Sequence, residues 1–146
     1  MRISIAAVGD MMIGTDYPKN HLPDDDGVSF LADVAPFLQA ADIAFGNLEG
    51  VLIEGGEPAK KCRNLNACYL FRSPPRYAAH YGDAGFDVLG LANNHARDFG
   101  EEGRDASAAA LGAHGRHGGV PCGLAALAAG ARDHADVVDV HVDALG

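Results

Sequence analysis

The chain has 146 residues, of which 48% are hydrophobic and 21% are charged, and its formal net charge is −9 at pH 7. This composition is ordinary for a globular protein, and the length is enough for one domain with a real core. The negative charge argues against nucleic acid or an anionic membrane surface as the main partner. It is compatible with carboxylates gathered to hold cations, and solubility alone also explains it.

The first third of the chain alternates strand and helix patterns. Residues 2–9 form a short apolar run that stops at glycine, which predicts a buried strand and is too short for a membrane span. Residues 28–42 have helical spacing, with Ser29 as a possible N-cap and Pro36 expected to bend or split the helix. Residues 43–48 predict a second buried strand.

The same alternation continues further along the chain. The expected elements are an irregular loop at 54–67, a short strand or hairpin arm at 68–75, a helix at 75–85 ending at Gly85, a third buried strand at 86–92 and a helix at 101–115. Apolar strands that alternate with helices predict an α/β layered fold around a largely parallel sheet.

The C-terminal segment differs in composition. Residues 116–146 are rich in alanine and glycine, and all ten aromatic residues lie before position 100. Two interpretations remain open: an Ala-rich helix followed by a last strand at 137–142, or the truncated or frame-shifted end of a longer chain. The predicted organisation is therefore a folded part at 1–115 and a tail of doubtful authenticity at 116–146.

Three cysteines occur, at positions 62, 68 and 122. No export signal or membrane anchor is visible, so a cytoplasmic location with reduced thiols is expected. Cys62 and Cys68 are close enough in sequence to pair in an oxidising compartment, but reduced thiols are the favoured interpretation.

Polar residues follow each of the three predicted strands. Strand one ends at Asp10, strand two ends at Asn47 and Glu49, and strand three ends at Asn93, Asn94, His95 and Asp98. Ligands of open α/β sheets bind beyond the carboxyl ends of the strands, so these groups are expected on one rim. Carboxylate and amide oxygens with one imidazole suit Mn, Mg, Fe or Zn. The pattern predicts a divalent metal site, with a histidine able to donate a proton to a leaving group.

Each of these residues also has a purely structural interpretation. Asp10 fits a loop cap, Asn47 with Glu49 fits a turn, and Asn94 with His95 fits a helix cap. Asp98 is expected to orient His95, or to cap the following helix, rather than to bind metal. The recurrence of polar residues after three strands favours the metal interpretation.

Four segments together resemble a known family. They are VGDMMIG (8–14), ADIAFGNLEGVL (41–52), FRSPPRYA (71–78) and AGFDVLGLANNHARDFGEEG (84–103). In this order they resemble the CapA-type capsule-synthesis proteins of poly-γ-glutamate biosynthesis, which are similar to calcineurin-like metallophosphoesterases. The resemblance implies a layered α/β metallophosphoesterase-like sandwich, here the N-terminal half of the domain, with two divalent metals in a complete homologue.

The resemblance also implies roles for individual residues. It makes Asp10, Glu49 and Asn94 metal ligands and His95 the catalytic acid or phosphate-contacting group, with Asn47, Asn93 and Asp98 in support. It implies a metal-dependent phosphoesterase or hydrolase that acts on poly-γ-glutamate or a phosphorylated small molecule, and it allows association with the cell envelope.

The chain departs from the family pattern after about residue 103. Family members carry further histidine motifs in a later half, and the histidines of the tail do not match them. Whether this chain is an enzyme therefore stays open. The alternative is a truncated, inactive fragment or a partner-dependent binding module, for which an exposed sheet edge is expected.

Overall fold

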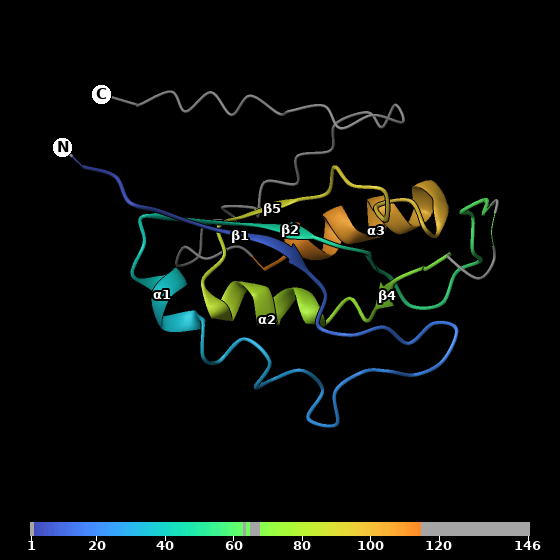
Figure 1. The fold of residues 1–146 in the computed structure, drawn as a ribbon, viewed down its shortest axis with the longest axis horizontal. Helices are drawn as coiled ribbons and strands as arrows, with labels where there is room; N and C mark the ends of the chain where they lie inside the picture. Colours follow the sequence, from blue (N-terminus) through green and yellow to red (C-terminus); the bar gives the residue numbers. More distant parts are fainter. Residues whose placement is uncertain (1, 63, 65–67, 115–146) are drawn as a thin grey trace.

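A computed structural model describes residues 2–62, 64 and 68–114. Figure 1 shows the order of the elements. They are β1 (Ile5–Met11), α1 (Ala35–Gln39), β2 (Ile43–Leu48), β3 (Val51–Leu52), β4 (Arg72–Ser73), α2 (Tyr77–Ala84), β5 (Val88–Gly90) and α3 (Gly100–Gly112). The predicted tail, with its possible strand at 137–142, lies outside the described residues.

The central sheet has three parallel strands in the order β1-β2-β5. The three predicted strands are therefore neighbours, and the predicted α/β class with a parallel sheet is confirmed. Parallel strands point their carboxyl ends to the same edge of the sheet. The residues that follow β1, β2 and β5 are thereby brought to one rim.

The main core lies between the sheet and its helices. Along β2, Ala44 and Leu48 are buried on one face, and Figure 1 shows α1 and α2 along one side of the sheet. Tyr77 and Tyr81 of α2 join Leu111 of α3 in this core. Burying an aliphatic or aromatic side chain of this size contributes about 1.5–3 kcal/mol, so these contacts fix the sheet on which the polar rim is built.

Two expectations about the N-terminal part were wrong. β1 is exposed over most of its length, with Ile5 62% exposed, because it is an edge strand of the sheet within the described residues. The helix expected at 28–42 is a turn-rich segment that becomes helical only at α1, with proline near its start. Ser29 does not cap that helix, because its hydroxyl and amide both donate to Asp25.

A second, two-stranded sheet pairs β3 with β4 in parallel. The segment at 68–75 is therefore a short strand and not a hairpin arm. Ser107 of α3 holds this sheet, since its hydroxyl accepts the Leu52 amide hydrogen at 2.8 Å and donates to the Gly103 carbonyl. α3 thereby fixes β3, which directly follows the polar residues of β2.

The helix after β4 ends at Gly85 as expected, with φ at 108°. α3 begins at Gly100 and has no side-chain cap. Within the part of the chain that the structure describes, no helix has the length and apolar character needed to cross a bilayer.

Candidate functional site

The sheet register brings the first two polar residues together. Asp10 lies opposite Asn47 in the β1–β2 pair, after an irregularity between Ala7 and Asp10. Such a bulge bends the strand and re-aims the side chains that follow it. Asn47 in turn lies opposite Gly90 of β5, which has no side chain to fill the adjacent space. Asn47 therefore lies centrally at the carboxyl rim of the sheet.

Asn47 links the two carboxylates of the site. Its Nδ2 atom donates to Asp10 Oδ1 at 2.7 Å and to Glu49 Oε2 at 3.2 Å. Burial raises the pKa of the Glu49 carboxyl; the nearby His95 opposes this shift, and the charges of Asp10 and Asp98 add to it. The carboxylates of Asp10 and Glu49 thus both accept hydrogen bonds from the Asn47 amide. The surroundings of Glu49 disfavour its charged form.

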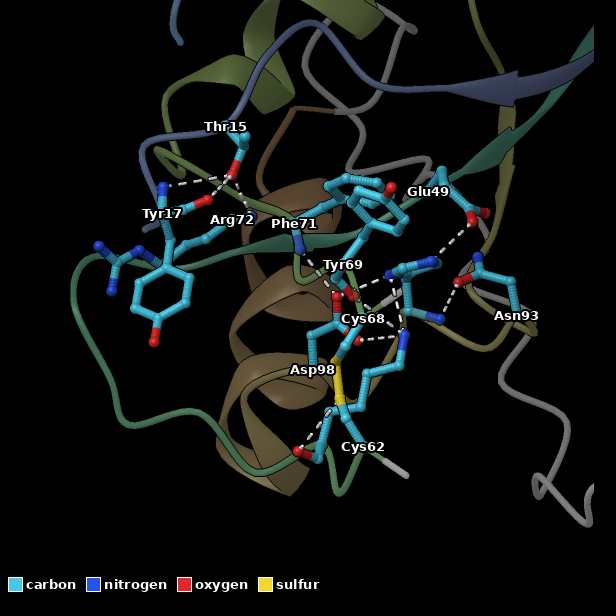
Figure 2. A network of polar contacts seen from close by, with 12 residues as sticks. Thr15, Tyr17, Glu49, Cys62, Cys68, Tyr69, Phe71, Arg72, Asn93 and Asp98 are labelled. Carbon is cyan, nitrogen blue, oxygen red and sulfur yellow. Dashed lines mark hydrogen bonds and ion pairs between the residues drawn. A yellow bond between two sulfur atoms is a disulfide. The ribbon is translucent and has the colours of Figure 1, made fainter. Parts of the chain in front are cut away.

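The segment after β5 supplies an imidazole. His95 Nδ1 lies 2.7 Å from Asp98 Oδ2, and His95 Nε2 lies 3.4 Å from Glu49 Oε1. Asn93 fixes the turn, because its Oδ1 accepts the His95 amide hydrogen and its Nδ2 donates to Asn47 Oδ1 at 3.0 Å. Figure 2 labels Asn93, Glu49 and Asp98 as members of this polar network.

Asp98 is a positioning group in the structure. Its side chain is 0% exposed, and its Oδ2 accepts the Phe71 amide hydrogen at 2.8 Å in addition to its contact with His95. The helix that follows has no side-chain cap, so the capping alternative for Asp98 does not occur. The Phe71 ring stacks on the His95 ring with centroids 4.4 Å apart. His95 is therefore held both by hydrogen bonding and by stacking.

Sequence reasoning missed Lys60 and Phe71. Lys60 Nζ lies 3.1 Å from Asp98 Oδ1 and 3.2 Å from His95 Nδ1. Lys60 belongs to the irregular loop, and 35 positions along the chain separate it from His95. No periodic pattern marks a lysine in such a loop. Phe71 belongs to the FRSPPRYA segment, and nothing in that segment's pattern indicates that its ring stacks on an imidazole.

The structure also joins Cys62 and Cys68 in a disulfide, against the favoured expectation of reduced thiols. Their proximity comes from the two arms of the loop, which run side by side near Asp98. Ala59 donates its amide hydrogen to the Asp98 carbonyl on one arm, and Phe71 donates to the Asp98 side chain on the other.

Asn94 is placed differently from the other predicted residues. Its side chain is exposed and lines an open hollow of about 430 Å³ beside His95 and Lys60. Among the described residues, no side-chain hydrogen bond joins it to Asp10, Asn47 or Glu49, whereas Asn93 reaches Asn47. Asn93, the neighbouring asparagine, occupies the hydrogen-bonding position between β2 and the histidine turn.

The donor set fits a divalent ion in its chemistry. Asp10 and Glu49 converge on the Asn47 amide, and the His95 imidazole lies beside Glu49. Carboxylate, amide and imidazole groups suit hard or borderline divalent ions. Across residues 2–62, 64 and 68–114, however, no three groups from His, Cys, Asp and Glu are arranged closely enough to hold a metal by themselves.

Comparison with known proteins places the chain in a family. Residues 4–132 match the model of the bacterial capsule synthesis protein family PGA_cap. Two proteins of Sinorhizobium fredii (strain NBRC 101917 / NGR234), described as uncharacterized proteins y4sH and y4uA, are each 29% identical to it over 104 residues.

These alignments cover 68% of this chain and 20% of each relative, so the chain spans about a fifth of the length of the curated relatives it matches. The family match continues past residue 115, into the alanine- and glycine-rich segment. On the extent of this match, the chain belongs to the family of bacterial capsule synthesis proteins, PGA_cap.

Proposed function

We propose that this chain carries part of the active site of a metal-dependent hydrolase of capsule synthesis, acting on a phosphoester or amide bond. The observation that carries the proposal is the connected network from Asp10 through Asn47 and Glu49 to His95 and Asp98. Asp10 and Asn47 lie near the carboxyl ends of β1 and β2, and Glu49, His95 and Asp98 follow β2 and β5, so all five lie at the rim where α/β sheets bind their ligands. The proposed substrates are poly-γ-glutamate or a phosphorylated small molecule.

In this proposal Asp10 and Glu49 hold a divalent ion such as Mn, Mg, Fe or Zn, with Asn94 at the open side of the site. Such an ion, when bound, polarises a phosphoryl or acyl oxygen and lowers the pKa of bound water. A second ion, expected in a complete homologue, needs ligands beyond these residues. Burial raises the pKa of Glu49 and so disfavours its charged form. A cation beside Glu49 acts in the opposite direction and favours the charged carboxylate that this role needs.

His95 is the proposed proton donor to the leaving group. Asp98 lies against Nδ1 at 2.7 Å and Nε2 lies 3.4 Å from Glu49 Oε1, while His95 also lines the open hollow. A positioned histidine of this kind contributes about 10²- to 10⁴-fold to a hydrolysis rate. Phe71 covers one face of the ring, with the ring centroids 4.4 Å apart.

The test is hydrolysis of p-nitrophenyl phosphate and of a γ-glutamyl peptide in the presence of Mn²⁺. We expect metal-dependent turnover of one of them, which His95→Gln lowers about 10²- to 10⁴-fold. His21→Gln is the matched control, because His21 is exposed and lies outside the network. Turnover that His95→Gln leaves unchanged, or no metal-dependent turnover of either compound, would refute the enzymatic proposal.

A partner-dependent half-site is the second candidate function. It is favoured by the exposure of β1, which carries Asp10 at the edge of the sheet, and by the exposed position of Asn94. Under this proposal a further polypeptide pairs with β1 and completes the site. The isolated chain is then inactive but binds a divalent ion weakly, whereas the first candidate predicts turnover by the chain alone.

A further inference from the structure

The disulfide lies beside the residues that hold the histidine. Cys62 and Cys68 join two arms of one loop, and both arms contact Asp98. The first arm contributes the backbone amides of Ala59 and Lys60, which donate to the Asp98 carbonyl at 2.8 and 3.3 Å. The second contributes the Phe71 amide, which donates to Asp98 Oδ2. Figure 2 shows the Cys62–Cys68 disulfide, Phe71 and Asp98 in one close-up of the polar network.

Lys60 joins the two arms to the buried carboxylate. Its Nζ atom donates to the Tyr69 carbonyl at 3.2 Å and forms an ion pair with Asp98 Oδ1 at 3.1 Å. Asp98 Oδ1 is buried and accepts no hydrogen bond from the described residues, so Lys60 is the group that compensates its charge. A buried carboxylate that loses its ion-pair partner is strongly disfavoured.

The contacts of Asp98 select one form of the His95 ring. The separation of 2.7 Å between Nδ1 and Asp98 Oδ2 requires a hydrogen between them, and the imidazole supplies it. Nδ1 then has no free lone pair to accept a hydrogen from Lys60 Nζ, which lies 3.2 Å away. The Lys60 ammonium group is therefore paired with Asp98 instead. In the neutral ring the single hydrogen is thereby on Nδ1, and Nε2, 3.4 Å from Glu49 Oε1, carries a hydrogen only in the doubly protonated form that can donate to a leaving group.

We propose that Lys60 is a positioning residue for His95 and that the Cys62–Cys68 disulfide holds it in place, so that the redox state of this loop controls the orientation of the imidazole. The cross-link keeps the two arms together, and Lys60 acts on His95 through Asp98. The consequence for catalysis rests on the proposed hydrolase function, whereas the placement of His95 does not.

The reaction that releases the loop is ordinary thiol–disulfide exchange. A dithiol such as dithiothreitol reduces the Cys62–Cys68 bond through a mixed disulfide and becomes a cyclic disulfide itself. Two electrons and two protons pass to the protein sulfurs, giving two thiols. Without the cross-link the two arms gain conformational freedom, and Lys60 has to be ordered against Asp98 at a higher entropic cost.

The experiment reads the His95 tautomer directly by NMR, without metal or substrate. The full chain is labelled with ¹⁵N-histidine in a Cys122→Ser background, which leaves only Cys62 and Cys68 to react. Long-range ¹H–¹⁵N spectra are recorded at about pH 8, where free imidazole is neutral. Comparison with His95→Gln assigns the His95 signals.

In the oxidised protein we expect one protonated and one unprotonated ring nitrogen at well-separated shifts. Reduction by dithiothreitol and the Lys60→Met substitution should each move both nitrogens toward the averaged shifts of exchanging tautomers. Lys60→Arg should retain the oxidised pattern because it keeps the positive charge. Lys61→Met is the matched control and should retain it as well, since Lys61 is the exposed neighbour of Lys60.

An unchanged His95 pattern after full reduction, with free thiols confirmed by titration, would overturn the redox part of the proposal. An unchanged pattern in folded Lys60→Met would overturn the role of Lys60. If Lys60→Met does not fold, Lys60→Gln and the reduced wild-type protein supply the same comparison. Failure of the hydrolase proposal leaves these spectra unaffected, so the two proposals are tested separately.

Discussion

Glu49 shows at the scale of one residue how the site differs from an ordinary protein surface. Burial raises the pKa of its carboxyl, and Asp10 adds to this shift, so the folded protein holds the Glu49 proton more tightly than the unfolded chain does. The charged form is therefore disfavoured by folding at neutral pH. Binding sites commonly hold groups in such environments, because a ligand relieves the cost.

We predict that Glu49→Gln raises the melting temperature at neutral pH when EDTA is present. A group whose folded pKa is raised costs stability above that pKa, and this cost disappears as the pH falls through it. The difference between Glu49→Gln and wild type should therefore shrink as the pH is lowered. Thermal unfolding followed by circular dichroism at several pH values measures it. Glu54→Gln, on an exposed loop, should show no such gain, and an equal gain there would contradict the argument.

At the scale of one element, β3 helps to position Phe71, which contacts His95 and Asp98. It begins immediately after Gly50, which has φ at 113°, and a Cβ atom there would lie 2.8 Å from the Phe71 Cβ atom. Phe71 stacks on His95 and donates to Asp98. The glycine of the Asn-Leu-Glu-Gly segment therefore has a physical reason: it allows the close approach of Phe71, which directly precedes β4.

Gly50→Ala is predicted to lower the free energy of unfolding by about 2–4 kcal/mol, since both backbone strain and overpacking against Phe71 contribute. Gly55→Ala is the matched control. Gly55 also has positive φ, at 71°, but a Cβ atom there meets nothing within 4 Å. We expect a loss of about 1–2 kcal/mol from strain alone. Urea unfolding of both variants measures these free energies. Equal losses of unfolding free energy in the two variants would contradict the proposed role of Phe71.

Ser107→Ala is predicted to lower the free energy of unfolding by about 1–3 kcal/mol. The substitution leaves the buried Leu52 amide without its acceptor, and such a group costs its full desolvation penalty. Glu102→Ala, on the exposed face of the same helix, should cost only a few tenths of a kcal/mol by comparison. The same urea titration measures both; a loss for Ser107→Ala no larger than for the control would show that α3 does not hold β3 through this bond.

The elements best predicted from the sequence were those with a strong local signal. β2 has an apolar run of standard length, and α2 ends at a glycine with positive φ, so both agree with expectation. The prediction of a helix at 28–42 was wrong although the apolar spacing is helical. Asp25 accepts hydrogen bonds from Ser29 and stabilises a turn there instead. The edge position of β1, the pairing of β3 with β4 and the approach of Lys60 to Asp98 depend on tertiary structure, which periodicity does not report.

On the scale of the whole molecule, the described residues leave one region of the sheet open. β1 forms an edge and exposes Ile5 and Val8, while Phe37 of α1 is 76% exposed. An exposed edge strand offers unpaired backbone groups to another chain. The curated relatives are about five times longer than the matched segment, so additional polypeptide exists in the family.

We predict that the isolated chain associates with increasing concentration through β1. Ile5→Lys should weaken this association, because a lysine on an edge strand disfavours pairing with a second chain. Tyr69→Ser is the matched control, since Tyr69 is 65% exposed but lies in the loop beside the disulfide. Sedimentation velocity over a concentration series measures the effect. A wild-type chain that stays monomeric throughout would contradict it.

Metal binding tests the central claim most directly. Isothermal titration of the isolated chain with Mn²⁺ should show binding that Asp10→Asn and Glu49→Gln each weaken about 10-fold or more, because each removes one of the two converging carboxylates. Glu54→Gln should bind like wild type. Binding that is absent, or that neither Asp10→Asn nor Glu49→Gln weakens, would contradict a metal site at this rim of the sheet.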